Sequence, residues 1–237
     1  MHAVILAGGK GTRLAPYTRT FPKPMMPIGD KTILEVLLTQ LQHAGVCQVT
    51  LTVGHMAGLM RAFFQNGNNY SLDIHYSIEE EPLGTAGPLA VVEGLDDTFI
   101  VSNGDVLTTL DFNDMLTFHK AQGDAIATVA THCRTVHIDL GVIEIDGTHT
   151  IVDYIEKPDI DYLVSMGVYI FEPRILDYIT PGQYLDFPTL VQNLIANGQR
   201  VASYRFDGYY QDLGRPEDYE QACLDFETMR NKFILEE

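Results

Sequence analysis

Basic residues are scarce in this chain of 237 residues: 15 lysines and arginines stand against 32 aspartates and glutamates, and the formal net charge is −17. Proteins that bind nucleic acid usually present a broad basic face, so the composition argues against such a partner. The first 31 residues are the exception, with five basic side chains and one acidic one, a net charge of +4. This local excess favours a focused site for a small polyanion.

Cysteines and long apolar runs are also scarce. The three cysteines are isolated in the sequence, which fits a reducing cytosol better than a disulfide framework, so we expect a cytoplasmic protein. No apolar run approaches the roughly 20 residues of a membrane span, and the start of the chain lacks the basic segment of a signal peptide. We therefore expect no membrane partner. The eight histidines show no metal-ligand spacing.

The start of the chain is the stretch around which the rest is organised. An apolar run over residues 2–7 breaks into residues 8–14 (Gly-Gly-Lys-Gly-Thr-Arg-Leu), a pattern typical of a buried strand that ends in a loop. Glycines there let backbone N–H groups turn toward an anion, which Arg13 and Lys23 could also reach. The loop lacks the Gly-Lys-Ser/Thr ending of a P-loop, and the prolines that follow exclude the long helix of a dinucleotide-binding motif. We interpret it as a triphosphate cradle, while an ordinary turn with solvated charges stays open.

Apolar periodicity predicts an α/β fold. Predicted strands cover residues 2–7, 46–53, 72–78, 97–102, 125–131, 140–145, 151–155, 164–171 and 201–206. Predicted helices cover residues 32–44, 56–64, 86–93, 111–121 (capped by Asp111), 187–196 and 216–230. Alternation up to about residue 120 favours a parallel sheet, whose ligands bind beyond the carboxyl ends of its strands. We expect one mixed sheet whose second part covers the open side of the nucleotide site.

Three more clusters lie at predicted strand ends. Residues 80–88 (Glu-Glu-Pro-Leu-Gly-Thr-Ala-Gly-Pro) form a turn whose glycines allow close backbone approach. Lys157 stands beside a proline at a strand end, and Asp212 stands just before a predicted helix. Each has a plainer alternative: loop chemistry for the turn, a surface ion pair for Lys157 and helix capping for Asp212.

Six short motifs occur in the order seen in sugar-1-phosphate nucleotidyltransferases, also called nucleotide-sugar pyrophosphorylases, and the chain resembles that family from Ala3 to about Ala222. The motifs occupy residues 8–14, 22–24 (Pro-Lys-Pro), 83–87 (Leu-Gly-Thr-Ala-Gly), 103–105 (Asn-Gly-Asp), 156–158 (Glu-Lys-Pro) and 212–214 (Asp-Leu-Gly). The resemblance implies a Rossmann-like, mixed and mainly parallel sheet flanked by helices. It implies one domain over residues 1–237, with a nucleotide-binding part at 1–120 and a sugar-phosphate-binding part at 121–237. Some members append a left-handed β-helix, which we do not expect in so short a chain.

The resemblance also implies a reaction between a nucleoside triphosphate and a sugar 1-phosphate. A sugar phosphate oxygen attacks the α-phosphorus and pyrophosphate leaves. Arg13 would hold the departing phosphates, Lys23 the region of bond breaking and Lys157 the incoming sugar phosphate. Asp105, also counted as catalytic, and Asp212 would ligate Mg²⁺, which accepts two carboxylates plus waters and phosphate oxygens. By the same resemblance, nucleotide-binding residues are Leu6, Ala7, Gly8, Gly9, Gly11, Thr12, Glu79, Pro82, Gly84 and Thr85, and sugar-phosphate-binding residues are Gly141, Glu156 and Ser165. A homo-oligomer is left open.

Two short segments bear on the base and the sugar. Residues 80–89 look very like the mannose-1-phosphate guanylyltransferase branch, in which the base-reading side chain lies five residues before the glycine, here Glu79. A carboxylate can accept from guanine N1–H and N2–H₂ together, or from uracil N3–H alone. GTP is therefore favoured, while UTP, dTTP, CTP and ATP stay open. Ser165-Met166-Gly167 is similar to the ADP-glucose branch rather than to the Asn-Ala-Gly of many relatives, so a glucose- or heptose-type sugar stays open beside mannose.

Two other functions compete with this interpretation. A glycosyltransferase of related architecture also holds a metal by an aspartate at a strand end, but its sugar donor has no γ-phosphate and does not need Arg13. A non-catalytic subunit that senses nucleotide-sugars could dispense with the charged residues. The chain retains all of them: Arg13, Lys23, Asp105, Lys157 and Asp212.

Overall fold

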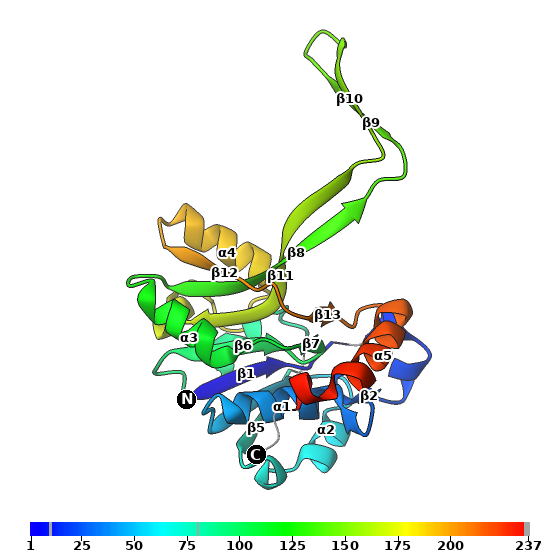
Figure 1. Ribbon diagram of the computed structural model, residues 1–237. Helices are drawn as coiled ribbons and strands as arrows, with labels where there is room; N and C mark the ends of the chain where they lie inside the picture. The colour runs from blue at the N-terminus through cyan, green and yellow to red at the C-terminus, as the bar shows by residue number, and fades with distance from the viewer. Residues whose placement is uncertain (10, 80, 235–237) are drawn as a thin grey trace.

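The computed structural model of the chain describes residues 1–9, 11–79 and 81–234 (Figure 1). Lys10 of the predicted basic segment and Glu80 of the predicted turn lie outside the described residues. The strands are β1 (His2–Leu6), β2 (Pro27–Ile28), β3 (Lys31–Thr32), β4 (Gln48–Val53), β5 (Asp73–Ile78), β6 (Phe99–Asn103), β7 (Val106–Thr108), β8 (Ala127–His137), β9 (Gly141–Ile145), β10 (Ile151–Glu156), β11 (Asp159–Phe171), β12 (Val201–Arg205) and β13 (Tyr210–Asp212). The α-helices are α1 (Ile33–His43), α2 (Ala57–Phe64), α3 (Phe112–Ala121), α4 (Phe187–Ala196) and α5 (Pro216–Phe233). The 3₁₀ helices are η1 (Thr12–Leu14), η2 (Tyr17–Arg19), η3 (Lys23–Met25), η4 (Asn68–Tyr70), η5 (Gly87–Val91) and η6 (Pro173–Tyr178).

A seven-stranded sheet in the order β12-β8-β11-β6-β1-β4-β5 forms the centre of the fold. The pairs β1–β4, β1–β6, β4–β5 and β8–β12 are parallel, whereas β11 is antiparallel to both of its neighbours, β6 and β8. This arrangement confirms the predicted mixed, mainly parallel sheet. Because β1, β4 and β6 run in the same direction, the loops that follow them meet at one edge of the sheet, where ligands of such folds bind.

Both faces of the sheet are covered, which explains the apolar runs of its strands. Along β1, Ala3 and Ile5 face one core cluster, to which α1, α2 and α3 contribute, whereas Val4 faces a second cluster with η5, η6 and α4. A third cluster packs α5 against the start of α1 and the β2 segment. None of the helices in the described ranges has the length and apolar character needed to span a membrane.

Local signals in the sequence set the helix ends. At α1, Thr32 and Glu35 form a capping box, with side-chain to backbone hydrogen bonds of 2.7 and 3.2 Å. At α3, the predicted cap is confirmed, because Asp111 accepts hydrogen bonds from the backbone N–H groups of Asn113 and Asp114 at 2.8 and 3.3 Å.

One predicted helix is wrong. Residues 86–93 form only the short 3₁₀ helix η5 instead of an α-helix. The backbone N–H groups of Ala86 and Gly87 both donate to the Leu185 carbonyl, at 2.9 and 3.0 Å. This segment is therefore tied to the loop before α4, a long-range contact that local periodicity does not reveal.

The strands β9 and β10 depart most from expectation. They pair only with each other and form a hairpin that projects away from the body at the outer ends of β8 and β11 (Figure 1). The expectation that all strands of the second half join one sheet over the nucleotide site is therefore wrong for this pair. The physical reason is that β8 and β11 stay paired from Asp159↔His137 to Ser165↔Thr131, which carries the hairpin outward. We call residues 132–165 the arm.

The tip of the arm is a turn held by an aspartate side chain. The Asp146 side chain accepts hydrogen bonds from the backbone N–H groups of Thr148 and Thr150 at 2.7 and 3.0 Å. This turn joins β9 to β10, as the Asp-Gly sequence at residues 146–147 predicts.

Candidate active site

A cavity of about 480 Å³ opens at the sheet edge where β1, β4 and β6 end. All the residues predicted to bind nucleotide line it: Leu6, Ala7, Gly8, Gly9, Gly11, Thr12, Glu79, Pro82, Gly84 and Thr85. Three predicted catalytic residues, Arg13, Lys23 and Asp105, line it as well. We call this cavity the nucleotide pocket. Its composition agrees with a cradle formed by the first loop and the strand ends around it.

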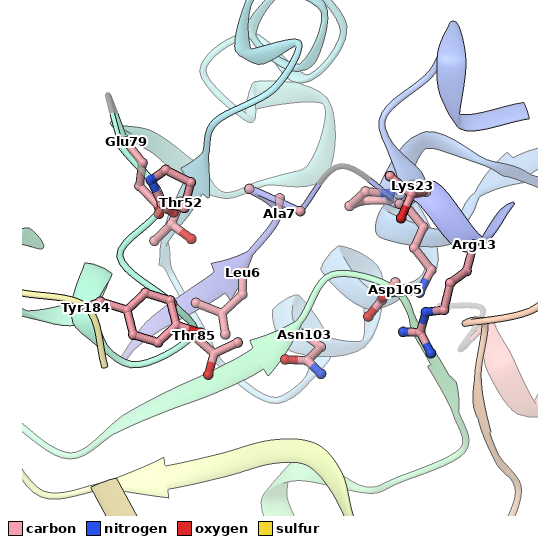
Figure 2. Close-up of a pocket in the computed structure, with 17 residues that line it drawn as sticks. Leu6, Ala7, Arg13, Lys23, Thr52, Glu79, Thr85, Asn103, Asp105 and Tyr184 are labelled. Carbon is pink, nitrogen blue, oxygen red and sulfur yellow. Dashed lines mark hydrogen bonds and ion pairs between the residues drawn. The ribbon is translucent and has the colours of Figure 1, made fainter. Parts of the chain in front are cut away.

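The two ends of the nucleotide pocket differ in chemistry. Figure 2 shows Glu79 and Thr52 at one end and Lys23, Arg13 and Asp105 at the other, with Ala7 between them. One end therefore offers a carboxylate hydrogen-bond acceptor, and the other offers cations together with an acid.

Glu79 lies close to the glycine loop and is hydrogen-bonded within its own turn. A Cβ atom on Gly8 would lie 2.9 Å from Glu79 Oε1, so glycine is needed for the carboxylate to lie there. Glu79 Oε2 accepts a hydrogen bond from the Leu83 N–H at 3.2 Å. Burial raises the pKa of Glu79, and the Leu83 hydrogen bond opposes part of that rise.

The turn at residues 82–87 closes one side of the nucleotide pocket. Gly84 has a φ angle of 82°, and a Cβ atom there would overlap the Leu185 carbonyl. The hydroxyl oxygen of Thr85 accepts the Phe187 N–H at 2.9 Å. As predicted, backbone closely approaches the glycines of this turn. The approaching backbone is the segment of the same chain that precedes α4.

Lys23 lies between two aspartates at the cationic end of the pocket. Its ammonium contacts Asp105 and lies 3.7 Å from Asp212 Oδ1, and its side chain is only 9% exposed. The antiparallel pairing of β7 with β13, which sets Asp212 opposite Val106, brings the two acids together from distant parts of the sequence. The structure therefore brings together Lys23, Asp105 and Asp212, three of the charged residues that belong to separate sequence motifs.

Asp212 has two features of a site residue. It does not cap α5, whose N-cap is Arg215 and lacks a side-chain hydrogen bond, so the capping alternative is wrong. Burial and the nearby Asp105 raise the pKa of Asp212, whereas Lys23 and Arg13 act in the opposite direction.

The donor set fits Mg²⁺ held jointly with a phosphate-bearing substrate. Within the described ranges, no group of three or more His, Cys, Asp or Glu side chains could hold a metal ion by itself. Mg²⁺ commonly takes one or two carboxylates and keeps waters and phosphate oxygens as its other ligands. Asp105 and Asp212 supply two convergent hard carboxylates, and they already surround a cation, the ammonium of Lys23.

The predicted sugar-phosphate residues are not brought to the nucleotide pocket. Gly141, Glu156 and Lys157 lie on the arm. There Lys157 Nζ forms a 2.8 Å ion pair with Asp139, and both side chains are more than half exposed, so the surface ion pair considered as the plainer alternative is present.

Ser165 and Asp212 line a second cavity of about 510 Å³, which we call the side cavity. Arg13 lines both cavities, so the two adjoin. The side cavity also contains Arg134 and Arg215, two basic residues that the sequence analysis did not single out.

Several residues of the nucleotide pocket were also missed: Pro24, Thr52, Asn103 and Tyr184. Asn103 ends β6 two residues before Asp105, so its place in the Asn-Gly-Asp motif was a usable signal. Thr52 is a polar residue inside the apolar strand β4, and in the described part of the chain its buried hydroxyl has no hydrogen-bond partner. Tyr184 has no comparable sequence signal.

We expect Asp212→Asn to raise the melting temperature at neutral pH. A carboxyl group whose folded-state pKa is raised opposes folding once it ionises, and this cost is absent at a pH below its ordinary value of 3.8. Calorimetry at pH 7 and near pH 3 should show a stabilisation that shrinks at the acidic pH. Asp177→Asn, on an exposed residue of η6, is the control. A variant several degrees less stable than wild type at pH 7 would contradict the pKa direction.

Comparison with known proteins assigns the family. The family model described as nucleotidyl transferase matches residues 2–228. The chain belongs to this family. The match confirms the resemblance to sugar-1-phosphate nucleotidyltransferases.

Two relatives of this nucleotidyl transferase are named for different substrates. A UTP–glucose-1-phosphate uridylyltransferase from Synechocystis sp. is 37% identical over 94% of this chain and 62% of the relative. A mannose-1-phosphate guanyltransferase from Schizosaccharomyces pombe is 33% identical over 97% of this chain and 66% of the relative. The chain thus spans slightly less than two thirds of the length of these relatives.

A solved structure is similar over nearly the whole fold. HddC from Yersinia pseudotuberculosis has a TM-score of 0.70 and 29% identity, over 95% of this chain and 99% of that chain. A second structure of HddC, complexed with GMP-PN, has a TM-score of 0.67 and 27% identity, over 95% and 99% of the two chains.

Proposed function

We propose that the chain joins a nucleoside triphosphate, with GTP favoured, to a sugar 1-phosphate, and that it releases an NDP-sugar and pyrophosphate in an Mg²⁺-dependent reaction. The observation that carries this proposal is the nucleotide pocket itself, with Glu79 at one end and Arg13, Lys23 and Asp105 at the other. The family membership and the names of the relatives support it.

The mechanism needs alignment and charge neutralisation more than covalent chemistry. In nucleotidyl transfer a sugar phosphate oxygen attacks the α-phosphorus, the bond to the β-phosphate breaks, and pyrophosphate leaves. The backbone at Gly9 and Gly11 can cradle phosphates, Arg13 faces the departing pair, and Lys23 neutralises charge at the bond that breaks. Asp105 and Asp212 would hold Mg²⁺, which, when bound, neutralises charge on the phosphate oxygens.

The base is assigned to the end of the pocket that contains Glu79. Its carboxylate lies against Gly8 and can accept from two guanine donors at once. A fungal relative named as a guanyltransferase and an HddC structure complexed with GMP-PN support guanine. The cyanobacterial relative named as a uridylyltransferase keeps UTP as the alternative.

The proposal extends to the sugar phosphate and to the cellular setting. Ser165 at the side cavity, with Gly141, Glu156 and Lys157 on the arm, is proposed to bind the sugar phosphate, either of mannose or of a glucose- or heptose-type sugar. We retain the division into a nucleotide-binding part at 1–120 and a sugar-phosphate-binding part at 121–237. The cysteines Cys47, Cys133 and Cys223 are all free, which is compatible with a cytoplasmic enzyme.

The test is a matrix of nucleoside triphosphates against sugar 1-phosphates, read by release of pyrophosphate. We expect release only where both substrates are present, with GTP the best triphosphate. Release from a triphosphate alone, or none in any combination, would contradict the proposed function.

We expect Lys23 and Lys157 to affect different kinetic constants. Lys23→Ala should chiefly lower kcat, because charge at the bond that breaks grows in the transition state. Lys157→Ala should chiefly raise KM for the sugar phosphate, because the lost contact is to that phosphate. Lys120→Ala, on an exposed position of α3, is the control. Three variants with the same kinetics would refute the division of roles.

A further inference from the structure

Three arginines without a partner of their own line the side cavity. Within the described part of the chain, none of Arg13, Arg134 and Arg215 donates a hydrogen bond or forms an ion pair. Other arginines of the chain are paired with aspartates: Arg200 with Asp124, Arg205 with Asp207 and Arg230 with Asp30. The chain has 32 acidic residues against 15 basic ones, so pairing is the ordinary state of its arginines. Unpaired guanidinium groups around one cavity indicate a site for an anion.

The side cavity also contains two aspartates, but other groups already contact them. Asp212 Oδ1 lies 3.7 Å from the ammonium of Lys23. Asp218 accepts a hydrogen bond from the side-chain amide of Gln211 at 2.9 Å. Three arginines against two aspartates leave the cavity with a positive formal charge, and the guanidinium groups stay available to a ligand.

Arg13 and Asp212 connect the side cavity to the nucleotide pocket. Arg13 lines both cavities, whereas Asp212 lines the side cavity and approaches Lys23 of the nucleotide pocket. A Cβ atom on Gly214 would lie 3.2 Å from Asp212 Oδ2 and 3.3 Å from Arg13 Nη1, so the two charged groups flank the same glycine. An anion bound next to them lies beside the end of the nucleotide pocket that is proposed to hold the phosphates.

Of the two anionic substrates, the sugar 1-phosphate is the one that still lacks cations. The triphosphate, from which pyrophosphate forms, has Arg13 and Lys23 in the nucleotide pocket. Lys157, which is proposed for the sugar phosphate, forms an ion pair on the arm. The side cavity has a volume of about 510 Å³, enough for a small phosphorylated ligand, and Ser165 of the proposed sugar site lines it.

We propose that Arg134 and Arg215 bind the phosphate group of the sugar 1-phosphate in the side cavity, a role that rests on the proposed function. A planar guanidinium group can donate two parallel hydrogen bonds to phosphate oxygens, so one phosphate can accept from both arginines. Arg134 lies on β8 at the base of the arm, and Arg215 is the N-cap of α5. The bound phosphate therefore joins the arm to the body of the fold.

The first test is kinetic and uses a sugar phosphate that the wild-type enzyme accepts. Arg134→Gln and Arg215→Gln should each raise KM for the sugar phosphate about tenfold, the scale of one hydrogen bond to a charged group, and leave KM for the triphosphate unchanged. Arg134→Lys should lie between wild type and Arg134→Gln, because lysine keeps the charge and loses the planar fork. Arg61→Gln, on an exposed arginine of α2 outside both cavities, is the matched control.

An unchanged KM for the sugar phosphate in both glutamine variants would overturn the proposal. A rise confined to the KM for pyrophosphate in the reverse reaction would also overturn it, because the arginines would then bind the leaving group. Neither guanidinium has a hydrogen bond or ion pair within the described chain, so the variants should melt at the wild-type temperature. That measurement separates a lost phosphate contact from a damaged fold.

The second test needs no turnover. Inorganic phosphate is titrated calorimetrically into the chain saturated with Mg²⁺ and α,β-methylene-GTP, a nucleotide that cannot transfer its α-phosphate. Wild type and Arg61→Gln should bind the phosphate, and Arg134→Gln and Arg215→Gln should bind it about tenfold more weakly.

Equal phosphate affinity in all four proteins, or none in the wild type, would overturn the site even if pyrophosphate release is normal, and the proposed function would stand. Phosphate binding that depends on both arginines, in a chain that releases no pyrophosphate from any substrate pair, would refute the proposed function and leave the anion site in place.

Discussion

Asp105→Asn is expected to lower kcat by at least about 10², the scale of removing one preorganised electrostatic group. The amide keeps the shape of the side chain and removes its charge. The Asp105 carboxylate contacts the ammonium of Lys23, whose side chain is only 9% exposed, so the variant disturbs a group with little access to water. The same carboxylate is one of the two proposed for Mg²⁺.

The measurement is the initial rate as a function of Mg²⁺ concentration, with saturating substrates. We expect the Asp105 variant to need more Mg²⁺ for its residual activity, whereas Asp177→Asn should match wild type. An Asp105→Asn enzyme with unchanged turnover at limiting Mg²⁺ would remove Asp105 from the proposed metal site.

GTP is expected to exceed ATP by a factor on the order of 10² in kcat/KM. Adenine presents an acceptor at N1, which meets the lone pairs of the Glu79 carboxylate, whereas guanine presents two donors there. A site built to pair a polar group rejects the ligand that leaves it unpaired more strongly than an apolar pocket rejects a change of size. UTP and dTTP are the expected secondary substrates.

Glu79→Gln should erode this preference, mostly by lowering kcat/KM for GTP, while the neighbouring and exposed Glu81→Gln should not. Burial raises the pKa of Glu79 above its ordinary 4.5, so the GTP preference should decline on acidification before an ordinary glutamate would be protonated. A wild-type enzyme that prefers ATP, or an unchanged ranking in Glu79→Gln, would show that another residue reads the base. The similarity of Ser165-Met166-Gly167 to the ADP-glucose branch would then be the better guide.

Much of the fold could be predicted because its strands and helices depend on local signals. The apolar run of β1 packs against a core cluster on each face of the sheet, and Asp111 caps α3 as its position suggests. The helix predicted over residues 86–93 is wrong because the N–H groups of Ala86 and Gly87 bind the distant Leu185 carbonyl, a contact that local periodicity does not reveal.

The nucleotide pocket could be predicted from sequence because parallel strands end at a common edge. The glycine loop after β1 and the Asn-Gly-Asp motif after β6 necessarily meet there. The β7–β13 pairing that brings Asp212 to Lys23 joins segments about a hundred residues apart, and only the resemblance to a family indicated it. The course of the arm depends on how far β8 and β11 stay paired, which no motif encodes.

The most direct test of the central claim is ³¹P NMR of one reaction that contains GTP, Mg²⁺ and an accepted sugar 1-phosphate. We predict that the triphosphate and sugar phosphate signals fall together, while signals of a nucleoside diphosphate diester and of pyrophosphate rise in equal amounts. Added pyrophosphate should drive the reaction backward. Added inorganic pyrophosphatase should drive it forward. Orthophosphate formed without any diester, or a sugar phosphate signal that stays constant while GTP is consumed, would contradict nucleotidyl transfer in this pocket.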